Sequence, residues 1–328
     1  MQFQGIIFNM TYECSLRCPH CFYYPQAAPR AAFTVARMRE IIASMKDVAP
    51  VREVHYTGGE PFLYYDRLLE AVAMAKESGA RRITCSTNGY WADDPDKTRR
   101  MLGALKEAGL TWFLISADAF HQDAVPLENI RILSQARVDL GLQGNDDLSV
   151  VAMITPEYEH PFNTRTREIV GKIREWGHGA SLHNSMPYGL GHELVPPDVC
   201  AMPRAERKCW EFRTWSFMDP KGPRTVIIGP DENVMVCYGV SLGNVRDKPL
   251  PVLLREYDEA PNPIVAALLT EGVEGVAARA EAHGWKRKPA YQNECHLCYC
   301  ARDWLRQYEP EFLQPDECYP DWTKRPKA

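Results

Sequence analysis

The chain has 328 residues, of which 45% are apolar and 25% charged, and its formal net charge is −5. These values are ordinary for a globular protein and leave room for one large domain and a smaller one. They exclude a strongly basic nucleic-acid-binding surface, and the absence of an 18-residue apolar run or a signal peptide argues against a membrane or secreted protein. Several of the eleven cysteines fall in C-x2-C spacings, which favour metal ligands in a reducing cytoplasm over disulfides.

Strand-like and helix-like segments alternate through the first half of the chain. Thr34 is a plausible N-cap for the first helix, and Asp94-Pro95 opens the third. Strands are expected at 5–9, 52–56, 82–86, 112–115, 148–154 and 180–184, and helices from 34, over 65–78, from 94, and near 127–137 and 164–176. Such alternation predicts parallel strands joined by right-handed crossovers.

The loop after the first strand carries three cysteines, Cys14, Cys18 and Cys21, in a C-x3-C-x2-C spacing. Three thiolates can hold three irons of a cubane cluster and leave the fourth iron open for a chelating molecule. The alternative is a structural zinc loop, although zinc usually takes four ligands in paired sets. His20 lies between two of the cysteines and could compete as a ligand.

The second motif is the segment 56–61, Tyr-Thr-Gly-Gly-Glu-Pro, which follows a strand and precedes a helix. Gly58 and Gly59 at a strand end allow a ligand to approach the bare backbone. Glu60 can accept hydrogen bonds from an ammonium group, and Pro61 completes the motif. Alone this is a plain turn, but about forty residues after the cysteine loop it becomes a specific signal.

Together, these two motifs resemble the radical S-adenosylmethionine (SAM) superfamily over roughly residues 5–185. The resemblance implies an α/β fold, a partial (β/α)6 TIM-like barrel. It also implies that the three loop cysteines bind a [4Fe–4S] cluster whose open iron chelates SAM, and that residues 58–60 receive the methionine ammonium. The reduced cluster would then cleave SAM to a 5′-deoxyadenosyl radical that abstracts hydrogen from substrate. An electron donor such as flavodoxin or ferredoxin is the implied partner.

Polar residues follow the third and fourth strands, where chemistry gathers in parallel barrels. Ser86 and Asn88 could hydrogen-bond SAM; the alternative is a simple Asn-Gly turn. Ser116 and Asp118 share one face of the chain, and residues at such positions often reach SAM in the resembled superfamily. His121 could face substrate, whereas the alternative is an N-cap at Asp118 with His121 on the surface.

The pattern changes after residue 186, where prolines mark a linker. We expect residues 1–186 to form the partial barrel and 187–328 to form the linker and a small α+β domain. That domain contains a hairpin expected to turn at residues 230–233. Its cysteines resemble a twitch-type auxiliary domain with one extra [4Fe–4S] cluster, for which the implied ligands are Cys209, Cys237, Cys295 and Cys298. Zinc on the same thiolates is the alternative, and Cys300 could replace Cys298.

The layout is also similar to that of short peptide epimerases of the superfamily, in which no leader-binding domain precedes the barrel. Ser116, Asp118 and His121 match their Ser-x-Asp-x-x-His strand end. Tyr238 stands where those enzymes place the cysteine that donates hydrogen to the substrate radical. Asp118, His121 and Tyr238 are therefore the candidate catalytic residues, and simple epimerisation is not expected.

The sequence predicts hydrogen abstraction from an unactivated carbon of a peptide-like substrate, with the second cluster as electron conduit or structural support. The main alternative is an enzyme for a small molecule such as a sugar, nucleoside or aminoglycoside. A non-catalytic cluster protein is the third class, but the Gly-Gly-Glu segment would have no use in it. Neither a nucleic acid nor a membrane is expected as a partner.

Overall fold

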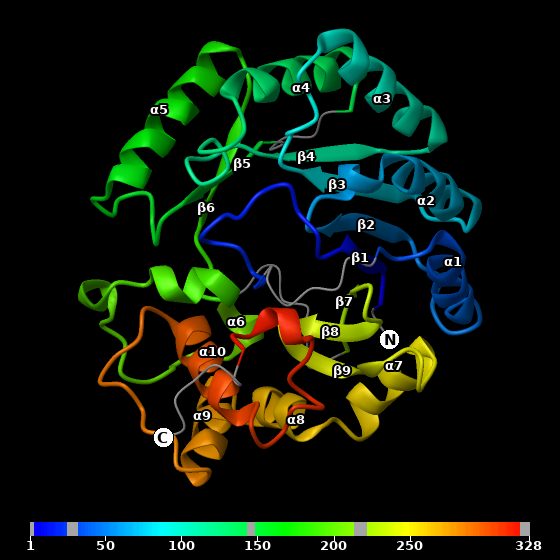
Figure 1. Cartoon of the computed structure of the whole chain (residues 1–328). Helices are drawn as coiled ribbons and strands as arrows, with labels where there is room; N and C mark the ends of the chain where they lie inside the picture. Colours follow the sequence, from blue (N-terminus) through cyan, green and yellow to red (C-terminus); the bar gives the residue numbers. More distant parts are fainter. Residues whose placement is uncertain (1–2, 25–31, 143–147, 213–221, 322–328) are drawn as a thin grey trace.

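The computed structural model describes four stretches of the chain: residues 3–24, 32–142, 148–212 and 222–321. A single nine-stranded sheet runs through them in the order β6-β5-β4-β3-β2-β1-β7-β8-β9 (Figure 1). Its strands are β1 Gly5–Thr11, β2 Glu53–Gly58, β3 Arg82–Thr87, β4 Trp112–Ser116, β5 Leu148–Ala152, β6 Ala180–Asn184, β7 Thr225–Ile228, β8 Asn233–Cys237 and β9 Val240–Asn244.

Strands β1 to β6 are parallel neighbours, as the alternation predicts. The six expected strands are all present, including the short β6, which pairs with β5 along its whole length. The sheet curves but does not close (Figure 1). The expected fold class, an α/β partial barrel, is therefore confirmed.

Five helices follow the first five strands and cover one side of the sheet (Figure 1): α1 Val35–Ser44, α2 Tyr65–Glu77, α3 Pro95–Ala108, α4 Leu127–Asp139 and α5 Pro161–Glu175. The predicted caps are confirmed, because the side chains of Thr34 and Asp94 accept from the backbone N–H groups three residues on. Helix α5 starts three residues earlier than expected. Pro161 suits its first turn, and the His160 ring accepts from the Phe162 N–H.

The two sides of the sheet differ in burial. Val54 and Tyr56 of β2 point toward the helices and are fully buried, and the Tyr56 hydroxyl donates to the Ala71 carbonyl of α2 at 2.6 Å. The alternating residues of the strands, such as His55 of β2 and Leu114 of β4, face the concave inner side and are only half-buried. This inner side is thus the part of the barrel that solvent and ligands can reach.

The later part of the chain continues the same sheet. Strand β7 pairs in parallel with β1, and β7 to β9 then form antiparallel hairpins with the expected turn after residue 229. The remaining elements are η1 Pro61–Tyr64, η2 Gly189–Leu194, η3 Pro197–Val199, α6 Cys209–Phe212, α7 Leu250–Glu259, α8 Pro263–Thr270, α9 Val273–Ala282, α10 Glu294–Leu305 and η4 Asp316–Cys318. The pairing of β7 with β1 is not foreseen by the sequence, and the boundary at residue 187 stays a prediction.

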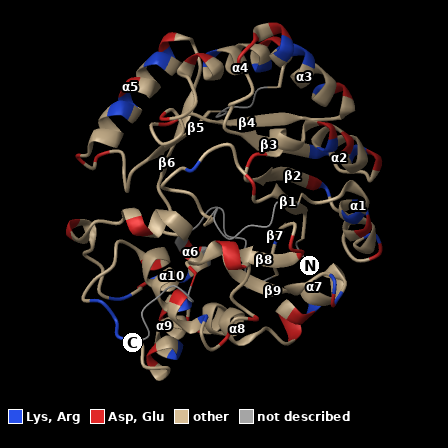
Figure 2. Cartoon of the chain, in the orientation of Figure 1, with Lys and Arg blue, Asp and Glu red and all other residues tan. Residues whose placement is uncertain are grey.

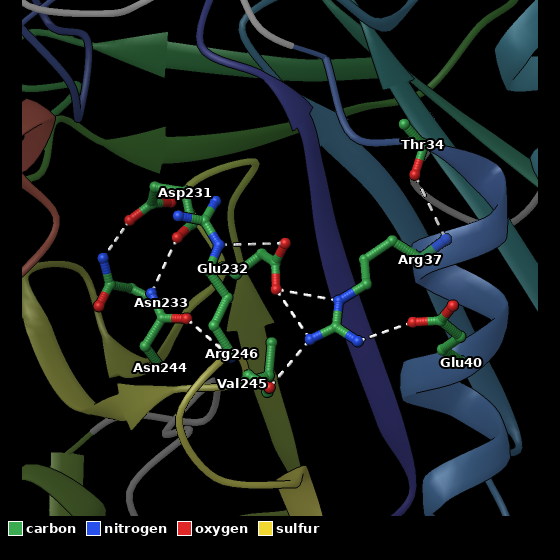
Figure 3. Close-up of polar contacts among 9 residues, drawn as sticks. All are labelled: Thr34, Arg37, Glu40, Asp231, Glu232, Asn233, Asn244, Val245 and Arg246. Carbon is green, nitrogen blue, oxygen red and sulfur yellow. Dashed lines mark hydrogen bonds and ion pairs between the residues drawn. The ribbon is translucent and has the colours of Figure 1, made fainter.

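Polar contacts join the barrel to the hairpin (Figure 3). Arg37 of α1 donates through Nε to the Glu232 carboxylate at 2.9 Å and through Nη2 to the Val245 carbonyl at 2.9 Å. It also contacts Glu40 one turn along its own helix at 2.7 Å. Arg246 approaches the other oxygen of Glu232 at 3.3 Å. One guanidinium therefore links the first helix to the β7–β8 turn at Glu232 and to Val245, the residue that follows β9.

Charged side chains of both signs alternate over the outer helices, while the strands carry few (Figure 2). In the part of the chain that the structure describes, no helix is long and apolar enough to cross a membrane.

Candidate active site

The cysteine loop lies between β1 and α1, on the inner side of the sheet (Figure 1). Cys14, Cys18 and Cys21 are half-buried and close enough for their thiols to interact electrostatically. Burial raises the pKa of Cys14 to about 12 and that of Cys21 to about 11. Such thiols stay protonated in the free chain, and a bound metal would displace their protons.

Close backbone contacts hold this loop against the end of β2. The Gly59 N–H donates to the Thr11 carbonyl at 2.6 Å, and the Glu60 N–H donates to the Glu13 carbonyl at 2.9 Å. A Cβ on Gly59 would overlap the Glu13 carbonyl, and Gly58 has a φ of +124°. The two glycines thus serve the close approach of the cysteine loop. Their predicted contact with SAM stays a prediction.

The Glu60 carboxylate is buried and accepts three hydrogen bonds from this chain. The donors are the Phe62 N–H at 3.1 Å, the Thr87 hydroxyl at 2.8 Å and the Asn88 N–H at 2.8 Å. Burial raises the pKa of Glu60 to about 7, although these three bonds act in the opposite direction. Glu60 therefore ties the ends of β2 and β3 together, and its contact with an ammonium group stays a prediction.

The two polar residues at the end of β3 have different surroundings. The amide of Asn88 donates to the Ser15 hydroxyl at 3.1 Å and to Cys14 Sγ at 3.7 Å, so Asn88 lies against the cysteine loop. Ser86 instead hydrogen-bonds His55 Nε2 at 2.9 Å on the inner side of the sheet. The Asn-Gly turn is also present, with a φ of +76° at Gly89.

Asp118 and His121 form a buried pair beyond β4. Asp118 Oδ1 accepts from the ring Nδ1 of His121 at 2.9 Å and from the N–H groups of Phe120 and His121, while Oδ2 accepts from the Val151 N–H at 3.1 Å. The His121 side chain is only 13% exposed. The alternative with His121 on the surface is therefore wrong. Ser116 lies half-buried at the end of β4.

This pair reaches the cysteine loop through His121, which hydrogen-bonds Cys18. Burial alone would lower the pKa of His121, but Asp118 and then Cys18 raise it well above its usual value. His20 completes the group: its ligand atom and those of Asp118 and His121 lie within 4.8 Å of one another. Burial lowers the pKa of His20 to about 4, so its ring is neutral. The group can hold a proton beside the loop.

The C-terminal thiols gather around an arginine that the sequence reading missed. Cys237 ends β8, Cys298 lies on α10, and both interact electrostatically with the buried Arg302. Cys295 also acts on Cys298, and Cys318, a thiol without an expected role, lies near Cys237. The signal for Arg302 was its position four residues after Cys298, one helical turn away. Cys209, the remaining residue of the predicted ligand set, begins the short helix α6.

Tyr238 lies among aromatic rings between the two thiol regions. Its ring centroid is 4.6 Å from that of Phe22, 5.7 Å from Tyr23 and 6.2 Å from Tyr188. Phe22 directly follows Cys21, and Tyr238 directly follows Cys237. The Tyr238 carbonyl accepts from Arg302 at 2.7 Å. The position predicted to be catalytic is thus packed between the cysteine loop and β8, and its role stays a prediction.

Comparisons with known proteins agree with this geometry. A model of the Radical SAM superfamily matches residues 8–160. Fe-coproporphyrin III synthase of Methanosarcina barkeri (strain Fusaro / DSM 804) is 36% identical over 121 residues, 36% of this chain and 28% of that protein. The putative peptide biosynthesis protein YydG of Bacillus subtilis (strain 168) is 25% identical over 130 residues, 39% of this chain and 40% of that protein. Residues 8–160 of this chain are therefore a Radical SAM domain.

These matches span well under half the length of either curated relative. Similarity over nearly the whole chain comes from a solved structure, native anSMEcpe with bound AdoMet. It has a TM-score of 0.50 and 12% identity, and it covers 93% of this chain and 96% of that one. At that identity it supports the fold alone.

The residues present fit the group that the superfamily uses. Iron–sulfur clusters are held by cysteine thiolates, and three thiols lie together on the β1–α1 loop. The buried carboxylate of Glu60 lies close enough to interact with Cys14. The donor set is therefore one of soft thiols with an acidic group beside it, and soft thiolates suit iron–sulfur clusters.

Proposed function

We propose that this protein reductively cleaves SAM and abstracts a hydrogen atom from an unactivated carbon of a peptide-like substrate. The observation that carries the proposal is the group of three thiols on the β1–α1 loop, fixed to the Gly59–Glu60 backbone. Cys14, Cys18 and Cys21 would hold a [4Fe–4S] cluster with one open iron. When bound, a reduced cluster of this kind would supply the electron that breaks the C5′–S bond of SAM, giving methionine and a 5′-deoxyadenosyl radical.

The chain's own residues would bind and orient SAM next to the loop. The segment 58–61 and Asn88 border Cys14, so they are the groups nearest to a ligand placed there. Glu60 would take the ammonium group, whose positive charge offsets the cost of a buried carboxylate. Ser86 and Ser116, at the ends of β3 and β4, would contact the rest of the molecule.

Asp118 and His121 would control a proton beside the bound SAM. The carboxylate keeps the Nδ1 proton of His121 in place and favours the charged imidazolium. A cation at this position stabilises negative charge on the cysteine loop. The pair would therefore position the loop and present a proton to its surroundings, while the half-buried inner face of the sheet receives substrate.

In this proposal residues 1–186 form the radical SAM barrel, and residues 187–328 hold a second [4Fe–4S] cluster. Its ligands would be Cys209, Cys237, Cys295 and Cys298, on α6, β8 and α10. The electrostatic contacts among the last three support this set. The rings around Tyr238 lie between the two sites and would exclude water from the space between them.

Two observations bear on the substrate. The relative named as a putative peptide biosynthesis protein favours a peptide. The relative named Fe-coproporphyrin III synthase favours the alternative, a small molecule. Co-expression with short peptides encoded beside the gene, followed by mass spectrometry, would separate the two. A mass change in such a peptide supports the first, whereas turnover of a sugar, nucleoside or aminoglycoside supports the second.

The radical chemistry is tested by changing Cys14, Cys18 and Cys21 together to Ala. The variant should lose about one cluster of iron and form no 5′-deoxyadenosine with SAM and dithionite, because no thiolate remains to hold the metal. Cys85→Ala is the matched control, since this buried thiol of β3 is not an assigned ligand of either site. Continued 5′-deoxyadenosine formation by the triple variant would show that the assignment is wrong.

We further propose that the substrate radical ends by oxidation, elimination or bond formation, because Tyr238 occupies the donor position. A reaction in deuterated water, with the product weighed by mass spectrometry, tests this. The expected product differs in composition from the substrate. A product of unchanged composition with one deuterium at carbon would indicate epimerisation through Cys200, Cys300 or Cys318 instead. Single substitutions of these thiols would then identify the donor as the variant that cleaves SAM without net product.

A further inference from the structure

A second group of metal-ligand side chains lies outside the site described above. His192, His296 and Cys300 each present one ligand atom, and the three atoms lie within 4.8 Å of one another. His192 Nε2 is 3.4 Å from Cys300 Sγ. His296 and Cys300 are buried, and His192 is half-buried. None of the three has a part in the proposed cleavage of SAM.

The fold brings these residues together from two separate segments. His296 and Cys300 are four residues apart on α10, so they share one face of that helix. His192 comes from η2, in the segment that follows β6. Met202 and Tyr291 pair as an antiparallel bridge with backbone bonds of 3.0 and 2.8 Å, which fixes this segment beside the start of α10.

The same segment supplies a fourth donor. Cys200 lies two residues before the bridge at Met202 and interacts electrostatically with Cys300. Its Sγ is not among the ligand atoms that lie within 4.8 Å of one another, so this side chain would have to move closer to complete the site. Cys200 is half-buried and donates a hydrogen bond to the Pro196 carbonyl at 3.6 Å. The set then contains two imidazoles and two thiols, which is a common donor set for structural zinc.

The distance between His192 Nε2 and Cys300 Sγ and the net charge of the filled site both suit zinc. Tetrahedral Zn²⁺ with bonds of about 2.3 Å to sulfur and about 2.0 Å to nitrogen separates the two ligands by about 3.5 Å. The observed separation of His192 and Cys300 is 3.4 Å. Lys288 acts electrostatically on Cys200, His296 and Cys300. Two thiolates cancel the charge of the metal, so the filled site is neutral beside this lysine.

The other face of α10 carries the thiols assigned to the cluster. Cys295 and Cys298 are three residues apart and share a face, and Cys298 interacts with Cys237 and Arg302. Cys300 follows Cys298 by two residues, about 200° around the helix, and therefore points away from that group. The contact of Cys300 with His192 agrees with this placement.

We propose that His192, Cys200, His296 and Cys300 bind one structural Zn²⁺ that fixes the segment 189–200 to helix α10. Cys300 would then be a zinc ligand and not an alternative to Cys298. Helix α10 would serve two metal centres, one on each face. Of the three candidate donors Cys200, Cys300 and Cys318, only Cys318 would remain available to donate hydrogen to a radical.

The test is metal analysis of the untagged full-length chain, reconstituted anaerobically with iron and sulfide and then treated with EDTA. We expect about one zinc per chain in addition to the cluster iron. Cys300→Ala and His192→Ala should each lose most of the zinc and keep the iron. The matched variant Cys298→Ala should show the reverse, with iron lost and zinc kept.

X-ray absorption at the zinc edge keeps the test independent of how the variants fold. The wild-type spectrum should show two sulfur ligands at about 2.3 Å and two nitrogen ligands at about 2.0–2.1 Å. Zinc with four sulfur ligands would place the metal at the cluster thiols and overturn the proposal. The same holds if the wild-type chain binds no zinc, if both variants keep their zinc, or if Cys300→Ala loses iron instead.

Discussion

The two thiol regions of the molecule are built in different ways. The first set lies within eight residues on one loop between a strand and a helix, and backbone bonds from Gly59 and Glu60 hold that loop. The second set comes from β8 and α10, which are far apart in the chain. A local set can be found from spacing alone, whereas a dispersed set depends on how the tertiary structure packs.

The difference also concerns what surrounds the thiols. The loop is bordered by groups that can hold or exchange charge, namely Glu60, Asn88 and the Asp118–His121 pair. The dispersed set is bordered by Arg302 and by stacked or tilted rings, including Tyr299 against Tyr319 with centroids 5.6 Å apart. The first environment suits chemistry on a bound ligand, and the second suits a closed site whose metal has no open position.

The largest effect that would test this contrast is on the iron content of a variant that lacks two of the C-terminal thiols. Cys237→Ala combined with Cys298→Ala should lower the iron from about eight to about four atoms per chain, on the count of two cubanes. It should leave 5′-deoxyadenosine formation in place, because the loop thiols are unchanged. Iron analysis and chromatography of the nucleoside measure both. If the double variant kept its iron but lost SAM cleavage, the two thiol regions would not hold separate clusters. If the wild type contained only about four irons together with zinc bound by four sulfurs, the C-terminal thiols would hold structural zinc instead.

The next effect concerns the contact between loop and strand. Gly59→Ala should destabilise the chain by about 1–3 kcal/mol or more and abolish SAM cleavage, since the added Cβ overlaps the Glu13 carbonyl. Gly103→Ala is the control: nothing lies within 4 Å of its added Cβ in helix α3, and it should stabilise by about 0.5 kcal/mol. Urea unfolding measures both. Equal stability of the two variants would show that the loop is not fixed at Gly59.

The sequence predicts the barrel well because its signals are local. Thr34 and Asp94 cap the helices that they were expected to cap, and β6 spans its expected residues 180–184. Periodicity and capping depend on neighbours in the chain, so a reader of the sequence can see them. The same holds for Cys14, Cys18 and Cys21, which the fold brings together on their own loop.

What the sequence does not predict depends on contacts between distant residues. Nothing near β7 indicates that it pairs with β1, more than two hundred residues earlier. The contacts of Cys300 with His192 and of Arg302 with Tyr238 likewise join separate elements. Gly59 was assigned to a ligand because a strand-end glycine suits both a ligand and a neighbouring chain, and only the structure reveals the neighbouring loop.

A smaller effect is expected in the pH dependence of stability. Burial raises the pKa of Glu60 to about 7, so the folded chain binds this proton more tightly than the unfolded chain does. The contribution of Glu60 to stability should therefore fall as the pH rises from about 4.5 to about 7 and stay level above that. Comparing urea unfolding of the wild type and Glu60→Gln at several pH values measures it.

The control for this experiment is Glu70→Gln, a change at an exposed carboxylate on α2. It makes the same chemical change at the surface, outside the candidate site. A difference between wild type and Glu60→Gln that is constant with pH would show that Glu60 does not carry a raised pKa in the folded chain.

The smallest effect concerns the polar contact at the surface that joins helix α1 of the barrel to the β7–β9 hairpins. Arg37→Ala removes the bonds to Glu232 and Val245 that link α1 to the hairpin (Figure 3). The Arg37 side chain is 30% exposed, so water and salt weaken the ion pair, and we expect a loss of about 0.5–1 kcal/mol in the free energy of unfolding. Arg39→Ala, which breaks a more exposed pair with Glu77 on the neighbouring helix, should cost less than about 0.5 kcal/mol. Measuring the free energy of unfolding of both variants at low and high salt separates the contribution of the ion pair from that of the hydrogen bond to the Val245 carbonyl. Salt should reduce the ion-pair part of the Arg37 effect and leave the bond to the Val245 carbonyl, so a residual difference at high salt is expected for Arg37 and not for Arg39.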